Sequence, residues 1–189
     1  MTVKIPVAPR SAEKSSSSLL WSLGATFIVL VSAGLLVTWI SPGSLPRAGD
    51  PEVTFARDMI AHHEQAVEMA LIIRNRSEDA ELRQLALDIL LTQQAQLGQM
   101  QGWLAVWKMP LSGRKPPMQG HGAMMGIASQ ADINALQSLP IAQAEVLFLQ
   151  LMIRHHQGGV TMAESALTRT NRPEVQQLAK AIVSSQQSE

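Results

Sequence analysis

Residues 59–70 read MIAHHEQAVEMA, and residues 152–163, which begin 93 positions later, read MIRHHQGGVTMA. Four of the five histidines of the chain lie in these two stretches. The same offset preserves identical residues on either side of them, namely Phe55 and Phe148, Leu85 and Leu178, and Ile89 and Ile182. Repetition at one fixed spacing indicates that the chain contains an internal duplication of a single helical unit.

Both stretches are predicted to be helical, and the turn of about 100° per residue assigns each position to one face of the helix. In each copy the two histidines and the two flanking methionines fall in an arc of roughly 120°, which is the width of a core-facing stripe. The residues of this stripe are Met59, His62, His63 and Met69 in the first copy and Met152, His155, His156 and Met162 in the second. If the two hairpins pack about a pseudo-twofold axis, these stripes face each other inside a bundle.

The stripe combines imidazole and thioether groups, which are borderline-to-soft metal ligands that suit copper, and above all Cu(I). In an alternative interpretation, Met fills gaps in the core and His satisfies a buried hydrogen bond. Two adjacent His pairs at equivalent positions, each with Met on both flanks, favour the metal interpretation. Because imidazole must be neutral to bind a metal, the affinity is expected to weaken below about pH 6.

Charge and composition narrow the class of protein. The 189 residues include 15 basic and 15 acidic side chains, so the chain lacks the positive charge that nucleic-acid binding requires. The absence of Cys excludes disulfides, thiolate metal sites, iron–sulfur clusters and covalently attached haem. Few aromatic residues and many Ala, Leu, Gln and Met favour helix over strand. About 140 residues remain for folding outside the N-terminal segments, which suits a single domain.

The N-terminal part of the chain is predicted to anchor the domain to a membrane. Residues 1–18 are Ser-rich and basic, residues 19–40 contain no charge, and residues 41–49 form a Pro/Gly/Ser linker. As a helix, the uncharged segment would be roughly 33 Å long, which is enough to cross a bilayer. The positive-inside rule leaves residues 1–18 in the cytoplasm and exports the domain. A cleaved signal peptide is the alternative, although its apolar core is normally about 7–15 residues long.

Residues 50–189 are predicted to form a helical-bundle domain. Repeat 1 spans about residues 50–107 and repeat 2 about residues 140–189. In repeat 1, the Asp50-Pro51 pair is typical of a helix start. The first helix should run to about Arg76, and after a short connection the second should reach Trp107, so the two form an antiparallel hairpin.

Between the repeats, residues 108–128 interrupt the helical periodicity with Pro and Gly, and a short helix is expected to follow over residues 129–139. A segment of this length without regular structure is typically functional or mobile. It contains the candidate accessory ligands Met118, His121, Met124 and Met125. These residues either collect Cu(I) or Ag(I) or belong to a plain connector, and the two interpretations are equally supported.

Three glutamines, Gln93, Gln94 and Gln96, lie near the apolar stripe of the second helix. They either hydrogen-bond the imidazoles or form a solvated shoulder of the helix, and the second interpretation is favoured. If the first holds, Gln93 and its repeat counterpart Gln186 are the predicted hydrogen-bond partners of the histidines.

The Gly158-Gly159 pair interrupts the second His–Met stripe, at a cost of about 1 kcal/mol per Gly relative to Ala in a helix. Either this pair allows a close approach or a kink beside the histidines, or it is simply tolerated in a long packed helix.

Paired Met-x-x-His-His-x5-Met motifs, two helical hairpins, a Met/Gly loop and an exported N-terminus resemble the CopM-like, domain-of-unknown-function 305 family over about residues 50–189. The resemblance implies a ferritin-like four-helix bundle, an extracytoplasmic location and copper binding through His and Met. Its motif positions correspond here to the eight stripe residues given above. The Gly158-Gly159 pair and the short final helix depart from the family pattern.

These observations favour a membrane-anchored, non-enzymatic protein that binds copper, with Cu(I) favoured over Ag(I), for buffering, resistance or handover outside the cytoplasm. Its expected partners are the metal ion, the membrane, a metal-donor or acceptor protein and a second copy of the chain. One alternative is an oxidoreductase bundle with haem or another metal centre, although no Glu-x-x-His pair for a di-iron site is present. The other is a metal-free structural or interaction module, whose stability metal would leave unchanged.

Overall fold

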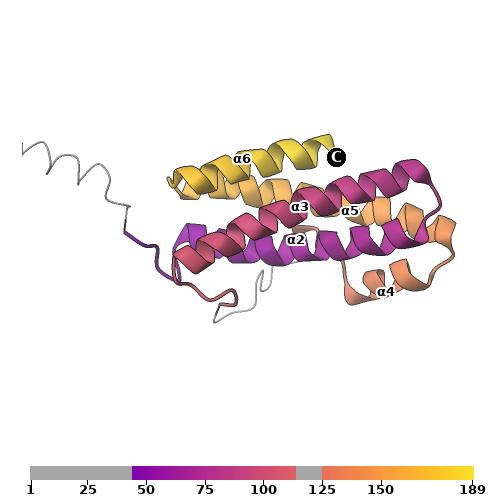
Figure 1. The fold of residues 1–189 in the computed structure, drawn as a ribbon, viewed down its shortest axis with the longest axis horizontal. Helices are drawn as coiled ribbons and strands as arrows, with labels where there is room; N and C mark the ends of the chain where they lie inside the picture. The colour runs from indigo at the N-terminus through magenta and orange to yellow at the C-terminus, as the bar shows by residue number, and fades with distance from the viewer. Residues whose placement is uncertain (1–43, 114–124) are drawn as a thin grey trace, which may run out of the picture. The chain divides into compact units, whose positions relative to one another are not determined.

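In a computed structural model, residues 44–113 and 125–189 are described (Figure 1). These residues form helices only, with no strand in either range, which confirms the all-α prediction. The helices are α2 (Pro51–Arg76), α3 (Ala80–Val106), α4 (Gln130–Ser138), α5 (Ile141–Arg169) and α6 (Pro173–Ser188). The finer assignment to a ferritin-like bundle stays a prediction.

The first hairpin begins and turns where the sequence predicts. Helix α2 starts at Pro51, whose fixed φ suits the first helical position. The preceding Asp50 does not cap a helical N–H, because its side chain accepts a hydrogen bond from the Arg47 N–H (2.7 Å). Helix α3 starts after Asp79, whose carboxylate accepts the N–H of Leu82 (2.8 Å). The short connection between the helices makes them antiparallel (Figure 1).

The second hairpin, α5 and α6, is joined to the first at one end of the bundle. Arg172, which precedes α6, donates a hydrogen bond to the Glu52 carboxylate on α2 (Nε to Oε1, 2.7 Å). The same guanidinium lies 5.5 Å from the ring centroid of Trp107 at the end of α3, within the range of a cation–π contact. One side chain therefore links the start of α6 to the ends of both helices of the first hairpin.

Helices α2 and α5 form the centre of the bundle, with α3 packed on α2 and α6 packed on α5 (Figure 1). The apolar core consists of two clusters along these helices. The first cluster includes Val53, Phe55, Met59, Leu97, Met100, Leu104, Trp107, Met162, Val175, Leu178 and Ile182. The second includes Met69, Ile73, Ile89, Ile133, Leu136, Phe148, Leu151 and Met152. The four paired histidines lie between the two clusters in the sequences of α2 and α5.

The return of the crossover loop is attached to both central helices. Gln65 on α2 makes two hydrogen bonds to the backbone of Ala128, donating to its carbonyl (2.9 Å) and accepting from its N–H (2.7 Å). Helix α4 follows, as expected, and begins with a capping box in which Ser129 and Asp132 bond each other's N–H groups. At its end, the Arg76 guanidinium donates to the carbonyls of Leu136 and Leu139.

The Gly158-Gly159 pair allows close approach, which decides between the two interpretations of this motif. A Cβ on Gly158 would overlap the backbone of Met125, and a Cβ on Gly159 would overlap the side-chain amide of Gln186. On the loop side, Gly126 has φ of +73°, and a Cβ there would overlap the backbone of Arg154. The loop backbone therefore lies directly against α5, one turn from the histidines, because both surfaces lack side chains.

Within the described ranges, no helix combines the length and apolarity needed to cross a membrane. The predicted anchor at residues 19–40 lies outside the described residues, as do three of the four candidate loop ligands, Met118, His121 and Met124.

Replacing Gly158 with Ala is expected to lower the free energy of unfolding by about 1–2 kcal/mol. The new methyl group must displace rigid loop backbone, and this overpacking outweighs the gain of about 1 kcal/mol in helix propensity. The matched control is Gly98→Ala on α3, where a Cβ meets nothing within 4 Å, so stability should rise. Urea unfolding of the two variants measures both effects, and a stabilised Gly158→Ala protein would contradict the close contact.

Candidate metal centre

The four histidines of the duplicated motif form one buried layer where α2 and α5 cross. His62 and His63 come from α2 and His155 and His156 from α5, and their exposed fractions are 0%, 0%, 0% and 6%. The rings of His62 and His155 are in contact, with centroids 3.6 Å apart and planes tilted by 31°. Within each pair the centroids are 6.2 and 6.3 Å apart. The predicted meeting of the two stripes inside the bundle therefore occurs at the repeat-equivalent residues His62 and His155.

The hydrogen bonds of three histidines determine which ring nitrogen carries the proton. The Nε2 of His62 lies 3.0 Å from the Met125 carbonyl, which can only accept, so this nitrogen donates. His63 Nε2 bonds Gln96 Oε1 (2.7 Å), and His156 Nε2 bonds Glu189 Oε2 (2.8 Å). In a neutral ring with a proton on Nε2, the lone pair is on Nδ1.

These Nδ1 atoms are buried and find no hydrogen-bond partner in the described part of the chain. The same is true of both ring nitrogens of His155 and of the side-chain amides of Gln93 and Gln186. A buried polar atom without a partner costs about 1–3 kcal/mol, and native structures contain few of them. So many orphaned acceptors in one layer indicate a place built to hold a polar or cationic ligand.

Burial keeps three of the imidazoles neutral, those of His62, His63 and His155. It lowers the pKa of His62 to about 4, although the bond to the Met125 carbonyl acts in the opposite direction. It lowers the pKa of His63 to about 3, against the opposing effect of Gln96. The pKa of His155 also falls well below its usual value, first through burial and then through the neighbouring histidines. At neutral pH these rings are therefore in the form that binds metal ions.

The four predicted methionines are buried on both sides of this layer. Met59 and Met162 belong to the first core cluster, with exposed fractions of 0% and 8%, and Met69 and Met152 to the second, with 0% and 5%. Each of the two core clusters thus contains one of these thioethers from each repeat. The first cluster also contains Met100, which has no counterpart in repeat 2.

The donor set fits a soft monovalent ion better than a hard divalent one. In the described residues, no three side chains among His, Asp and Glu come together with the spacing of a metal site. A site in this layer must therefore include thioether sulfur or reoriented imidazoles. Sulfur and imidazole donors in an apolar, water-poor interior are the surroundings that suit Cu(I) and Ag(I).

Two hydrogen-bond partners of the histidines differ from those that the sequence predicts. Gln93 and Gln186 are buried but do not bond the rings, whereas Gln96 and Glu189 do. The favoured interpretation of the glutamines as a solvated shoulder is wrong for Gln93 and Gln96, which are buried, and holds only for the exposed Gln94. The alternative considered for the three glutamines, a hydrogen bond to an imidazole, is therefore confirmed for Gln96. Glu189 lies 93 positions after Gln96, so the repeat offset is the signal that could have identified it.

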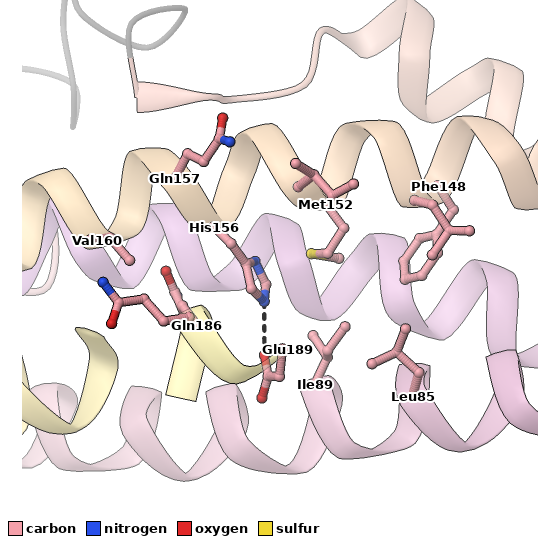
Figure 2. A pocket seen from close by; sticks show the side chains of 12 residues that line it. Leu85, Ile89, Phe148, Met152, His156, Gln157, Val160, Gln186 and Glu189 are labelled. Carbon is pink, nitrogen blue, oxygen red and sulfur yellow. Dashed lines mark hydrogen bonds and ion pairs between the residues drawn. The ribbon is translucent and has the colours of Figure 1, made fainter. Parts of the chain in front are cut away.

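A cavity of about 410 Å³ opens beside the histidine layer, between α3 and α5 (Figure 2). Its apolar wall includes Leu85 and Ile89 of α3 and Phe148 and Met152 of α5. Its polar end contains His156, Gln186 and Glu189, and Figure 2 shows the His156 ring directed at the Glu189 carboxylate. His156 thus lines a cavity that is open to solvent.

Stability should depend on pH through the buried histidines. Their folded-state pKa lies below the unfolded value of 6.5, so the unfolded state binds more protons as pH falls, and the stabilisation present above pH 6.5 is lost toward pH 4. His62 alone should lower the free energy of unfolding by about 2 kcal/mol between pH 7.5 and pH 5. Urea unfolding at several pH values measures this slope of the free energy of unfolding against pH.

In the same measurement, His62→Gln should have a shallower slope than the wild type, since it removes one such group. Glu164→Gln, at an exposed position on α5, is the control and should keep the wild-type slope. Equal slopes in all three proteins would show that His62 does not titrate below its usual range.

Comparisons with known proteins agree with this fold. Two solved DUF305 proteins are similar to the chain: one from Streptomyces coelicolor, described as secreted, has 45% identity and a TM-score of 0.70, covering 75% of this chain and 88% of its own. One from Deinococcus radiodurans has 44% identity and a TM-score of 0.69, covering 76% and 92%. CopM in its Cu(II)-bound form has 32% identity and a TM-score of 0.61, covering 74% and 89%.

CopM structures in Cu(I)-bound and silver-bound forms are also similar, at 29% and 28% identity with TM-scores of 0.58 and 0.57. No curated protein matches the sequence. The model of the family described as "Domain of unknown function (DUF305)" matches residues 52–189, which include both hairpins and all four paired histidines. The chain therefore belongs to the DUF305 family.

Proposed function

We propose that this protein binds Cu(I), and Ag(I) by the same chemistry, to buffer or hand over the ion outside the cytoplasm. One observation carries the proposal: neutral imidazoles with orphaned Nδ1 atoms form a buried layer with thioethers on both sides. Neutral ring nitrogens whose lone pairs accept no hydrogen bond from the described residues are suited to bind a metal ion. We propose binding rather than catalysis, because these buried lone pairs suit a metal ion.

The residues that would hold the ion are those of the duplicated stripe. His62, His63 and His156 would use Nδ1, since a hydrogen bond occupies Nε2 in each. In His155 neither nitrogen is hydrogen-bonded within the described residues, so whichever one is unprotonated could bind the ion. The sulfur atoms would come from the flanking methionines, namely Met59, Met69, Met152 and Met162. When bound, a soft monovalent ion would satisfy the orphaned acceptors without placing a large charge in the apolar core.

The relatives support this proposal. CopM, which has been solved with Cu(I), Cu(II) and silver, shares the fold and about three tenths of the sequence. The Streptomyces coelicolor relative is described as secreted, which supports an extracytoplasmic domain. We further propose that residues 19–40 anchor this domain in a membrane, with residues 1–18 in the cytoplasm, and that Met118, His121, Met124 and Met125 serve as an accessory loop for the same ion.

The proposal is tested by Cu(I) competition titration of the full chain in detergent micelles, under reductant, against a chromophoric chelator. The variant with all four paired histidines changed to Ala is expected to lose tight binding. Circular dichroism checks that this variant remains helical. If tight binding persists in a folded variant, the histidine layer is not the site and the accessory loop becomes the candidate.

A second set of variants tests the thioethers without opening cavities. Changing Met59, Met69, Met152 and Met162 to Leu removes sulfur but nearly conserves volume. Each substitution should therefore lower the free energy of unfolding by less than about 1.5 kcal/mol. Cu(I) affinity should fall by more than tenfold. The matched control is Met100→Leu, which removes an equally buried sulfur of the first cluster outside the motif and should change the affinity by less than about twofold. An unchanged affinity in the fourfold Met variant would exclude sulfur ligation by the stripe.

Cu(I) affinity should begin to fall at a lower pH than the pKa of an unperturbed imidazole would predict. With pKa values of about 4 for His62 and about 3 for His63, protons compete with the metal only below about pH 5. The expectation of weakening below pH 6 is therefore replaced by a nearly constant Cu(I) affinity from pH 7.5 to 5. A tenfold loss of affinity per pH unit across this range would show that the binding histidines are not the buried ones.

A further inference from the structure

The two repeats make the same hydrogen bond to a histidine with different acceptors. In repeat 1, His63 Nε2 bonds the amide oxygen of Gln96 at 2.7 Å. In repeat 2, His156 Nε2 bonds the carboxylate of Glu189 at 2.8 Å. Both acceptors lie 33 positions after their histidine, at equivalent places in α3 and at the end of α6. Duplication has therefore kept the bond while the charge of the acceptor differs by one unit between the two halves.

The surroundings of the two hydrogen bonds also differ, and those in repeat 2 are the more exposed. His63 is fully buried, Gln96 is 6% exposed, and neither lines the cavity beside the layer. His156 and Glu189 both line this cavity, with side-chain exposures of 7% and 13%, and the unpartnered amide of Gln186 lies at the same end (Figure 2). Repeat 2 therefore presents a partly exposed half-site with a carboxylate, and repeat 1 a buried half-site with a neutral amide.

The acceptor of the Nε2 proton tunes the opposite nitrogen of the ring. A carboxylate draws the proton more strongly than an amide does, which raises the electron density and basicity of Nδ1. It also places a full negative charge close to any cation bound there, and Coulomb attraction grows with the charge of that cation. Cu(II) prefers harder donors than Cu(I) and gains more from both effects. A neutral amide in a dry core instead favours the monovalent ion, which costs less to bury.

We propose that Gln96 and Glu189 are positioning residues that make the halves of the centre unequal, so that the His156 half selects Cu(II) and the His63 half selects Cu(I). This inference rests on the proposed copper-binding function and adds a specificity to it. The protein would accept copper in either oxidation state, each at its own histidine pair.

The test compares Cu(II) affinity, measured without reductant, and Cu(I) affinity, measured with reductant, in the full chain in detergent micelles. The variants are Glu189→Gln and Gln96→Glu, which exchange the acceptors while preserving side-chain size. Their controls are Glu164→Gln and Gln94→Glu, which make the same changes at exposed positions of α5 and α3. Electron paramagnetic resonance of the Cu(II) samples reports the ligand field directly, which a merely structural role would not change.

Glu189→Gln should lower Cu(II) affinity by about 10–100-fold, the usual effect of losing a partner behind a ligating histidine, and alter the Cu(II) spectrum. Its Cu(I) affinity should change by less than about threefold. Gln96→Glu should raise Cu(II) affinity, and both controls should match the wild type. In a His156→Ala background, Glu189→Gln should have no further effect, since the two residues act through one bond.

Two results would overturn the inference while leaving copper binding intact. In the first, Glu189→Gln has the same Cu(II) affinity and spectrum as Glu164→Gln, although binding still requires the histidines. In the second, Glu189→Gln lowers Cu(I) and Cu(II) affinity equally, which means that the carboxylate does not discriminate. If the histidine variants bind both ions as tightly as the wild type, the histidine layer is not the copper site, and the inference falls with that part of the proposed function.

Discussion

The contact between the rings of His62 and His155 is the constraint on which the centre of this bundle depends. Two imidazoles can pack at 3.6 Å in an apolar interior only while both are neutral, because two positive charges there would repel each other and remain unsolvated. Burial supplies this condition by lowering the pKa of each ring. The crossing of α2 and α5, and through it the packing of both hairpins, therefore requires the protonation state that metal binding also requires.

Around this contact the duplication is only approximately symmetric. Position 65 of repeat 1 is Gln, which bonds the returning loop, while its counterpart Gly158 has no side chain and lets the same loop lie against α5. The same loop thus contacts two repeat-equivalent positions in different ways. It forms hydrogen bonds with the side chain at position 65 and packs closely against the backbone at position 158. The loop therefore removes the symmetry that the repeated motif would otherwise impose on the centre.

Much of this organisation follows from local rules. Helical periodicity identifies the face that carries His62 and Met59, and the residues flanking α2 and α3 mark where each helix begins and ends. The partners of the histidines do not follow from such rules. Gln93 and Gln96 are one turn apart on α3, and only the crossing angle of the packed helices decides that Gln96 reaches His63. Likewise, the loop that Gly158 accommodates lies more than thirty positions earlier in the chain, which no local pattern reveals.

The bond from His62 to the Met125 carbonyl has a kinetic consequence. The ring cannot turn its Nε2 toward another partner without leaving that carbonyl unpaired, and residues 125–128 cannot move away without breaking the same bond and the two from Gln65. Displacement of this loop therefore breaks three hydrogen bonds and frees the His62 ring. Isolated side chains change rotamer in picoseconds to nanoseconds, whereas loops that must break several bonds move in microseconds or longer. An ion bound at this end of the layer, as proposed, should enter and leave no faster than the loop moves. Its residence time would then depend on the loop motion as well as on the affinity.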